Sequence, residues 1–154
     1  MITIGLTRLS VPFLVLLLAP ALMLSCPDRS AKQSDDKPTS TKVQLNKDFS
    51  LHVGQQVALE GESLKIKFAS VANDSRCPRE VTCVWAGNAE VLIQAEQSGK
   101  TTNLMLNTNG GEKFPREAQL DRYKVTLVSL NPQPSRDKGI KATDYEATLL
   151  IRKD

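Results

Sequence analysis

Three cysteines are the side chains of this 154-residue chain whose chemistry is most distinctive. Cys77 and Cys83 stand six positions apart, whereas Cys26 lies alone near the N-terminus. A thiol can form a disulfide, bind a metal, take part in redox exchange or carry a lipid, and its surroundings decide which. The residues around each cysteine therefore indicate the chemistry that it serves.

Cys26 follows a segment typical of a secretory signal peptide. Arg8 precedes an apolar run over residues 9–24, which two prolines interrupt. The run has about 16 residues, fewer than the roughly 20 that a membrane-spanning helix needs. It ends at Ser25 and Cys26, and in bacterial lipoproteins a small residue before a cysteine marks the cleavage site, after which the cysteine is acylated. We therefore expect a lipoprotein signal peptide over residues 1–25 and a lipid anchor on Cys26 in the bacterial cell membrane or outer membrane.

Two alternatives remain open, because residues 23–26 match a lipobox incompletely. Leucine is usual where Met23 stands, and a small residue is usual where Leu24 stands. An ordinary signal peptidase could instead cut after residues 19–21, or the apolar segment could stay uncut as a membrane anchor. Lipidation would hold the chain at a bilayer without a spanning helix, since each buried methylene contributes about 0.8 kcal/mol.

The segment after Cys26 is too polar to bury a core. Apart from prolines, one alanine is its only apolar residue as far as position 41, which is typical of a flexible tether. We assign residues 26–42 to the lipidated cysteine and linker. Residues 43–154, about 110 in number, are then enough for one domain. The whole chain carries a formal net charge of +3 with scattered basic residues, so we expect no nucleic-acid partner.

We expect Cys77 and Cys83 to form a disulfide. Lipidation would use the third cysteine, and export would place the other two in an oxidising compartment. Closing their loop would stabilise the domain by about 2 kcal/mol on the chain-entropy model. A zinc site has less support, because it needs about four ligands, whereas this chain offers the two thiols and a single histidine, His52. A redox-active pair usually has Cys-X-X-Cys spacing, which is absent. We expect no metal and no cofactor.

Around this pair lies a dense motif, and it allows two interpretations. Trp85, the only tryptophan, follows Cys83 by two positions and could fill one end of the core, with the disulfide fixing a corner. Alternatively, the motif could be a binding loop, since tryptophan and arginine are favoured at binding hot spots. The candidate binding residues are Asp74, Arg76, Arg79, Glu80 and Trp85.

The motif resembles that of a family of uncharacterised bacterial exported and lipid-anchored proteins. It has Asp-Ser-Arg-Cys-Pro followed by Cys-X-Trp-X-Gly, and the likeness is close over residues 74–87. It extends more loosely to the strand that follows and to the late strand at Asp144 and Tyr145. The resemblance implies no known activity, substrate or cofactor.

Elsewhere the apolar residues recur with a period of two, which indicates β-strands. Glycine, asparagine and proline turns separate these segments. We expect an all-β domain of about seven short strands, either an antiparallel β-sandwich or a partly closed barrel. One helical turn is expected over residues 115–120, and β-bulges are expected where the alternation slips, at 68–71 and 127–130. The expected strands are 49–53, 56–59, 64–68, 89–96, 103–106, 123–127 and 145–151.

No catalytic set stands out in this sequence. His52 belongs to a strand pattern that turns it towards solvent, and one histidine with two paired cysteines gives no nucleophile–base arrangement. We therefore expect a non-enzymatic, lipid-anchored module that binds a protein or other envelope component through its loops. Two alternatives are kept: an inhibitor of secreted hydrolases that inserts the Cys77–Cys83 loop, and a hydrolase that uses paired carboxylates.

Overall fold

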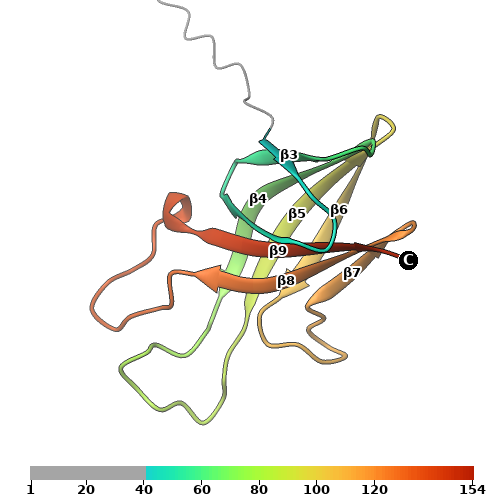
Figure 1. Ribbon diagram of the computed structural model, residues 1–154. Helices are drawn as coiled ribbons and strands as arrows, with labels where there is room; N and C mark the ends of the chain where they lie inside the picture. The colour runs from blue at the N-terminus through green and yellow to red at the C-terminus, as the bar shows by residue number, and fades with distance from the viewer. Residues whose placement is uncertain (1–40) are drawn as a thin grey trace, which may run out of the picture. The chain divides into compact units, whose positions relative to one another are not determined.

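Nine strands form two facing sheets in the computed structural model, which describes residues 41–154 (Figure 1). The first sheet has the order β1 (Thr41–Val43), β3 (Gln56–Leu59), β4 (Leu64–Asp74), β5 (Ala89–Gln97) and β6 (Lys100–Asn107). The second has the order β2 (Asp48–His52), β9 (Glu146–Lys153), β8 (Tyr123–Asn131) and β7 (Glu117–Leu120). The all-β expectation is confirmed, and the two separate sheets form a sandwich-like domain and not a closed barrel.

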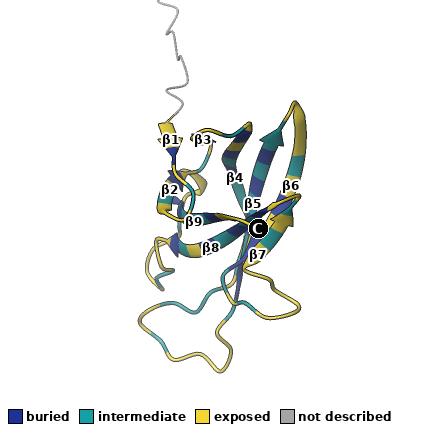
Figure 2. Cartoon of the chain, turned by 45° about the vertical axis from the view of Figure 1, so that its right-hand side comes forward, coloured by how far each residue is buried: buried dark blue, intermediate teal, exposed yellow. Residues whose placement is uncertain are grey.

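The period of two correctly predicted the strands that line the core. All seven expected segments form strands, and β5 shows the pattern clearly because Ala89, Val91, Ile93 and Ala95 are fully buried while the residues between them are half-exposed. Figure 2 shows the same banding along the other long strands. Alternate side chains of a strand point to opposite faces, so each sheet has one apolar face. The two apolar faces form a single core, in which Phe68 and Tyr123 are among the largest fully buried side chains.

Two strands were not predicted, and one predicted element is wrong. Residues 117–120 form β7 instead of a helical turn, because they pair with β8 through the register Leu120 to Tyr123 and pack Ala118 against the core. The short 3-10 helix lies later, at Ala142–Asp144. β1 pairs in parallel with β3, so the first sheet is not wholly antiparallel.

β1 also begins inside the range 26–42 that we assigned to the linker. The expected signal peptide, Cys26 and the rest of that linker lie outside the described residues. Within residues 41–154, no helix is long and apolar enough to cross a membrane.

The expected bulges are confirmed and occur where β4 and β8 approach their loops. The register of β4 on β5 shifts between Phe68 and Ser70 and again between Val71 and Asn73. That of β8 on β9 shifts between Leu127 and Ser129. A bulge bends and twists its strand, so these shifts set the direction in which the strand ends leave the sheets.

Three loops meet at one end of the sandwich, which we call the three-loop end (Figure 1). They are residues 75–88, 108–116 and 132–145, which follow β4, β6 and β8. The chain enters the domain towards the other end: Thr41 aligns with Val57 of β3, which aligns with Ile66 of β4. From Ile66 to the end of β4 is eight residues, or roughly 25 Å of strand.

Candidate binding surface at the three-loop end

The predicted disulfide between Cys77 and Cys83 is present. It lies in the segment between β4 and β5, residues 75–88, which we call the disulfide loop. This loop follows turns and bends instead of a strand. The disulfide bridge therefore restrains a segment that lies outside both sheets.

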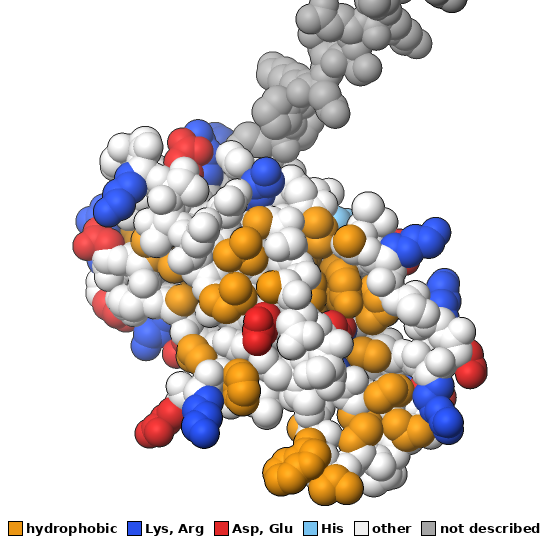
Figure 3. All heavy atoms as spheres, turned by 180° about the vertical axis from the view of Figure 1, so that it is seen from behind, with side chains coloured by type: hydrophobic (Ala, Val, Ile, Leu, Met, Phe, Trp, Pro, Cys, Tyr) orange, Lys and Arg blue, Asp and Glu red, His pale blue; other side chains and the backbone are white. Residues whose placement is uncertain are grey.

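Trp85 does not fill the core, so that interpretation is wrong. Its exposed fraction is 82%, and that of the neighbouring Val84 is 91%. The spacing of Trp85 from Cys83 places both side chains on one side only if the chain is extended, and here the chain bends. Hydrophobic side chains form the lowest point of the molecule in Figure 3, where the disulfide loop lies. The loop thus presents a hydrophobic tip, Val84 and Trp85, to solvent.

Asp74 and Arg76 form a buried ion pair beneath this tip. Arg76 Nε donates to Asp74 Oδ1 at 2.9 Å, and Arg76 Nη2 donates to Oδ2 at 2.7 Å. The backbone N–H of Arg76 adds a bond of 3.1 Å to Oδ1. Only 8% of the Arg76 side chain and 9% of the Asp74 side chain are exposed. These two candidate binding residues therefore support the loop from inside.

The same pair joins the disulfide loop to the end of β8 and the start of β9. Arg76 Nη1 donates to the carbonyl oxygen of Leu130 at 2.5 Å, and Nη2 donates to that of Pro132 at 2.8 Å. The Tyr145 hydroxyl donates to Asp74 Oδ2 at 3.0 Å. Burial alone would raise the pKa of Asp74, but the hydrogen bonds and charge of Arg76 outweigh it and lower that pKa.

Glu80 attaches the tip to the loop after β8. Its carboxylate accepts a hydrogen bond from Ser135 Oγ at 2.7 Å, one from the Arg136 backbone N–H at 3.1 Å and one from Arg79 Nε at 3.2 Å. The Ser135 bond is the main cause that lowers the pKa of Glu80 from 4.5 to about 2, against a smaller opposing effect of burial. Glu80 is thus a connection between loops, whereas most of the Arg79 side chain is exposed.

Backbone groups add further connections between the same two loops. The Arg79 N–H donates to the Pro134 carbonyl oxygen at 3.1 Å. Gln133 Nε2 donates to the Cys77 carbonyl oxygen at 2.9 Å. Cys77 is thus held from outside the loop as well as by the disulfide bond.

Two buried asparagines, missed by the sequence analysis, fasten the loop after β6. Asn88 Nδ2 donates to Asn107 Oδ1 at 2.7 Å, and Asn88 Oδ1 accepts the backbone N–H groups of Thr108 and Asn109, each at 3.1 Å. Asn107 Nδ2 donates to the Pro115 carbonyl oxygen at 3.2 Å. Their positions at strand ends were the signal in the sequence, because Asn88 precedes β5 and Asn107 ends β6. At such positions amide side chains pair with backbone groups that the sheet leaves free.

Gly87 lets the two limbs of the disulfide loop approach closely. Its φ is +70°, and a Cβ at this position would lie 1.9 Å from the carbonyl oxygen of Ser75. The approach permits the Ser75 N–H to donate to the Asn88 carbonyl oxygen at 2.7 Å. No other residue type could keep this geometry without moving the backbone.

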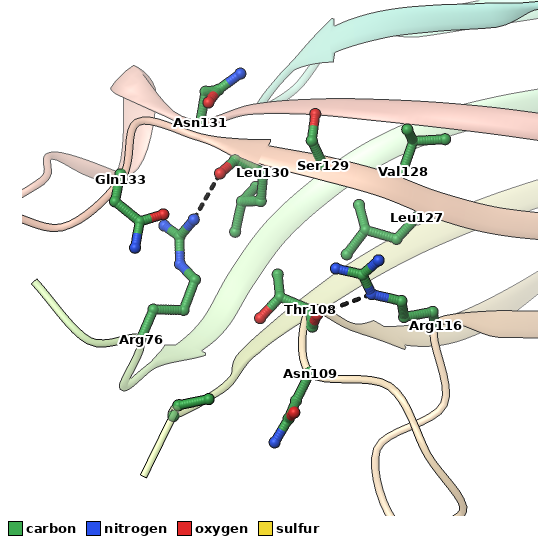
Figure 4. A pocket seen from close by; sticks show the side chains of 12 residues that line it. Arg76, Thr108, Asn109, Arg116, Leu127, Val128, Ser129, Leu130, Asn131 and Gln133 are labelled. Carbon is green, nitrogen blue, oxygen red and sulfur yellow. Dashed lines mark hydrogen bonds between the residues drawn. The ribbon is translucent and has the colours of Figure 1, made fainter. Parts of the chain in front are cut away.

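A cleft of about 420 Å³ opens between the disulfide loop and β8 (Figure 4). One wall is the second half of β8, from Leu127 to Asn131, and another is the backbone of Ala86 and Gly87. Arg116 comes from the loop after β6 and is held by a bond of 2.8 Å from its Nε to the Thr108 carbonyl oxygen. A second hollow, of about 630 Å³, continues on the far side of Arg116.

The described residues contain no group of three or more histidine, cysteine, aspartate or glutamate side chains that could hold a metal. His52 is exposed, as predicted. The carboxylates of Asp74 and Glu80 are each engaged by the contacts given above. No family model, curated protein or solved structure matches the chain. The exposed tip and the cleft are the parts of this end that another molecule could contact.

We predict that Arg76→Met destabilises the domain by about 3 kcal/mol, because it leaves the buried Asp74 carboxylate without its partner. Urea unfolding followed by circular dichroism measures the change. Arg79→Met is the matched control, since that side chain is largely exposed, and it should change the free energy of unfolding by less than about 0.5 kcal/mol. Equal effects of the two variants would contradict the structural role of the buried pair.

We predict that Ser135→Ala raises the pKa of Glu80 from about 2 towards 4.5, because it removes the main bond to the ionised carboxylate. A carboxyl with a lowered pKa contributes stability that is present above pH 4.5 and is lost as the pH falls through its folded value. Carbon-13 NMR of the glutamate carboxyl groups gives the pKa directly. Ser63→Ala, at a serine outside this contact, should leave it unchanged. A Glu80 pKa that stays near 2 in Ser135→Ala would show that other groups hold the charge.

Proposed function

We propose that the chain is an exported bacterial lipoprotein, anchored through an acylated Cys26, that binds a protein partner of the cell envelope with its three-loop end. It acts as a binding module and not as an enzyme. The observation that carries the proposal is the hydrophobic tip, Val84 and Trp85, presented on a fixed loop. Large apolar side chains held in water in this way mark interaction sites in soluble proteins.

The distribution of exposed apolar side chains supports this surface. Of the five large hydrophobic residues that are exposed in the described chain, four lie at the three-loop end or line its cleft, namely Val84, Trp85, Phe114 and Val128. The fifth, Met105, lies on β6. Interface hot spots are enriched in tryptophan and are surrounded by residues that exclude water. Trp85, the tryptophan of the tip, meets the first condition.

The rigid support of the tip also favours recognition. The disulfide, the Asp74–Arg76 pair and the Glu80 contacts hold the loop before any partner arrives. A preordered loop loses little conformational entropy on binding, so more of its contact energy appears as affinity. The same observation favours a second candidate function, an inhibitor of secreted hydrolases that inserts the Cys77–Cys83 loop into an active site.

The position of the tip agrees with attachment through the N-terminus. The chain enters the domain at Thr41, roughly 25 Å of strand away from the three-loop end. A lipid on Cys26 would therefore be linked to the domain at the side remote from the tip. The remote position of the tip favours a protein as its partner. It disfavours contact of the tip with the membrane that carries the lipid anchor.

We predict that Trp85→Ala reduces capture of the partner at least tenfold, because loss of a hot-spot tryptophan costs 2 kcal/mol or more. The full-length chain with a C-terminal tag is cross-linked in the envelope, purified and compared with Trp85→Ala. Met105→Ala removes an exposed hydrophobic side chain on β6, outside the disulfide loop, and should capture as much as the native chain. Undiminished capture by Trp85→Ala, with equal urea unfolding, would overturn the proposal. Inhibition of one enzyme in a panel of secreted hydrolases, lost in the same variant, would identify the second function.

We predict that Cys26→Ser moves the full-length chain from the membrane fraction to the soluble fraction, since the acyl chains then have no attachment point. Ser25→Ala keeps a small residue before the cysteine and should leave the chain in the membrane. Mass spectrometry of the natural product gives the modification itself. An unmodified thiol at Cys26 would contradict the anchoring part of the proposal.

A further inference from the structure

We propose that the cleft beside the tip binds an extended peptide segment of the partner that carries a carboxylate, with Arg116 as the group that recognises it. The inference rests on the proposed function and names the chemistry of the ligand. Four features of the cleft lead to it: its charge, the way in which Arg116 is held, the open edge of β8 and an exposed apolar side chain beside the charge.

The cleft carries positive charge without a compensating acid. Two arginines, Arg76 and Arg116, line it, and no aspartate or glutamate does. Arg76 is neutralised by Asp74 and uses its donors on that carboxylate and on two carbonyl oxygens. The charge available to a ligand is therefore that of Arg116. An anionic group on the ligand complements such a site.

Arg116 is held so that its terminal nitrogens stay free. Its Nε donates to the Thr108 carbonyl oxygen at 2.8 Å, and within residues 41–154 its two Nη atoms make no hydrogen bond or ion pair. Figure 4 shows the guanidinium lying between Thr108 and Leu127, on the cleft side of β8. The two Nη groups of an arginine match the two oxygens of a carboxylate. Because one bond already fixes the group, less side-chain entropy is lost when a ligand binds.

The edge of β8 favours a ligand in the extended conformation. β7 pairs only with Tyr123–Thr126, so the rest of β8 has β9 on one side and no strand on the other. An open edge can accept an extended peptide through its backbone groups. Here the open stretch is short, because the Leu127 N–H already donates to the Arg116 carbonyl oxygen and the Leu130 carbonyl oxygen accepts from Arg76. Side-chain contacts must therefore supply most of the specificity.

An apolar contact is available next to the charge. Val128 is exposed and lines the cleft at the point where the register of β8 shifts. In an extended ligand, successive side chains point to opposite sides, so a carboxylate and an apolar side chain two positions apart lie on one face. The cleft thus fits a segment in which acidic and apolar residues lie close together along the chain.

Fluorescence anisotropy with labelled peptides tests the inference. The probe is an eight-residue peptide with blocked ends, two repeats of Glu-Ser-Val-Ser, in which glutamate and valine are two positions apart and share one face of an extended chain. Its counterpart has glutamine in place of glutamate. The detergent-solubilised full-length chain should bind the glutamate peptide about tenfold more tightly, because a charge-assisted bidentate contact is worth at least that factor. Arg116→Gln should abolish the difference between the two peptides. Lys113→Gln removes a charge from the same loop outside the cleft and should preserve the difference.

Three results would overturn the inference. They are no binding of either peptide, equal binding of both, or equal loss in Arg116→Gln and Lys113→Gln while urea unfolding is unchanged. Binding to phosphatidylglycerol vesicles that depends on Arg116, without binding of the peptide, would assign the cleft to a lipid headgroup instead. The envelope cross-linking experiment separates this inference from the proposed function: a partner lost in Trp85→Ala but retained in Arg116→Gln leaves the proposed function standing and removes the role of the cleft.

Discussion

The buried ion pair between Asp74 and Arg76 is the interaction on which the three-loop end depends. Removing two charges from water is costly, and the cost is offset only when the remaining donors and acceptors are also satisfied. Here Arg76 donates to the carbonyl oxygens of Leu130, at the end of β8, and Pro132, just after it, and the Tyr145 hydroxyl donates to the Asp74 carboxylate. One pair therefore fixes the relative positions of three segments that are distant in the sequence. An apolar pair of similar size could fill the space, but it could not direct hydrogen bonds to these backbone groups.

This support explains how a hydrophobic tip stays in water. An unrestrained loop would tend to fold Val84 and Trp85 back onto the nearest apolar surface. The disulfide loop cannot do so, because Glu80 and the backbone of Arg79 tie it to the loop after β8. Gly87 lets its return limb approach Ser75, and Asn88 bonds that limb to β6 and the loop after it. The exposure of the tip is thus a consequence of polar contacts on three sides, and those contacts are what make it available to a partner.

The sequence predicted the strands better than the contacts between loops. Alternation in β5 and its neighbours reports burial on one face, which is a local property, and slips in that alternation located both bulged strands. The pairing of Cys77 with Cys83 was expected because Cys26 was assigned to a lipid and export was expected to place the other two cysteines in an oxidising compartment. The exposure of Trp85 and the burial of Arg76 could not be predicted in this way. Both depend on a loop whose path is set by residues more than 50 positions away. β7 was missed for the same reason: its conformation comes from pairing with β8 and not from its own residues.

The two ends of the sandwich differ in what they leave unsatisfied, and this difference argues for a division of roles. Near the end where the chain enters, Glu62 accepts hydrogen bonds from Lys153 and from the Tyr123 hydroxyl, and it lies 3.6 Å from Arg122. The Lys153 bond is the main cause that lowers the pKa of Glu62. At this end the charged side chains therefore pair with one another. At the three-loop end the Asp74–Arg76 pair is buried, while apolar side chains and the Arg116 nitrogens face solvent. Attachment at one end and recognition at the other is the arrangement that this asymmetry favours.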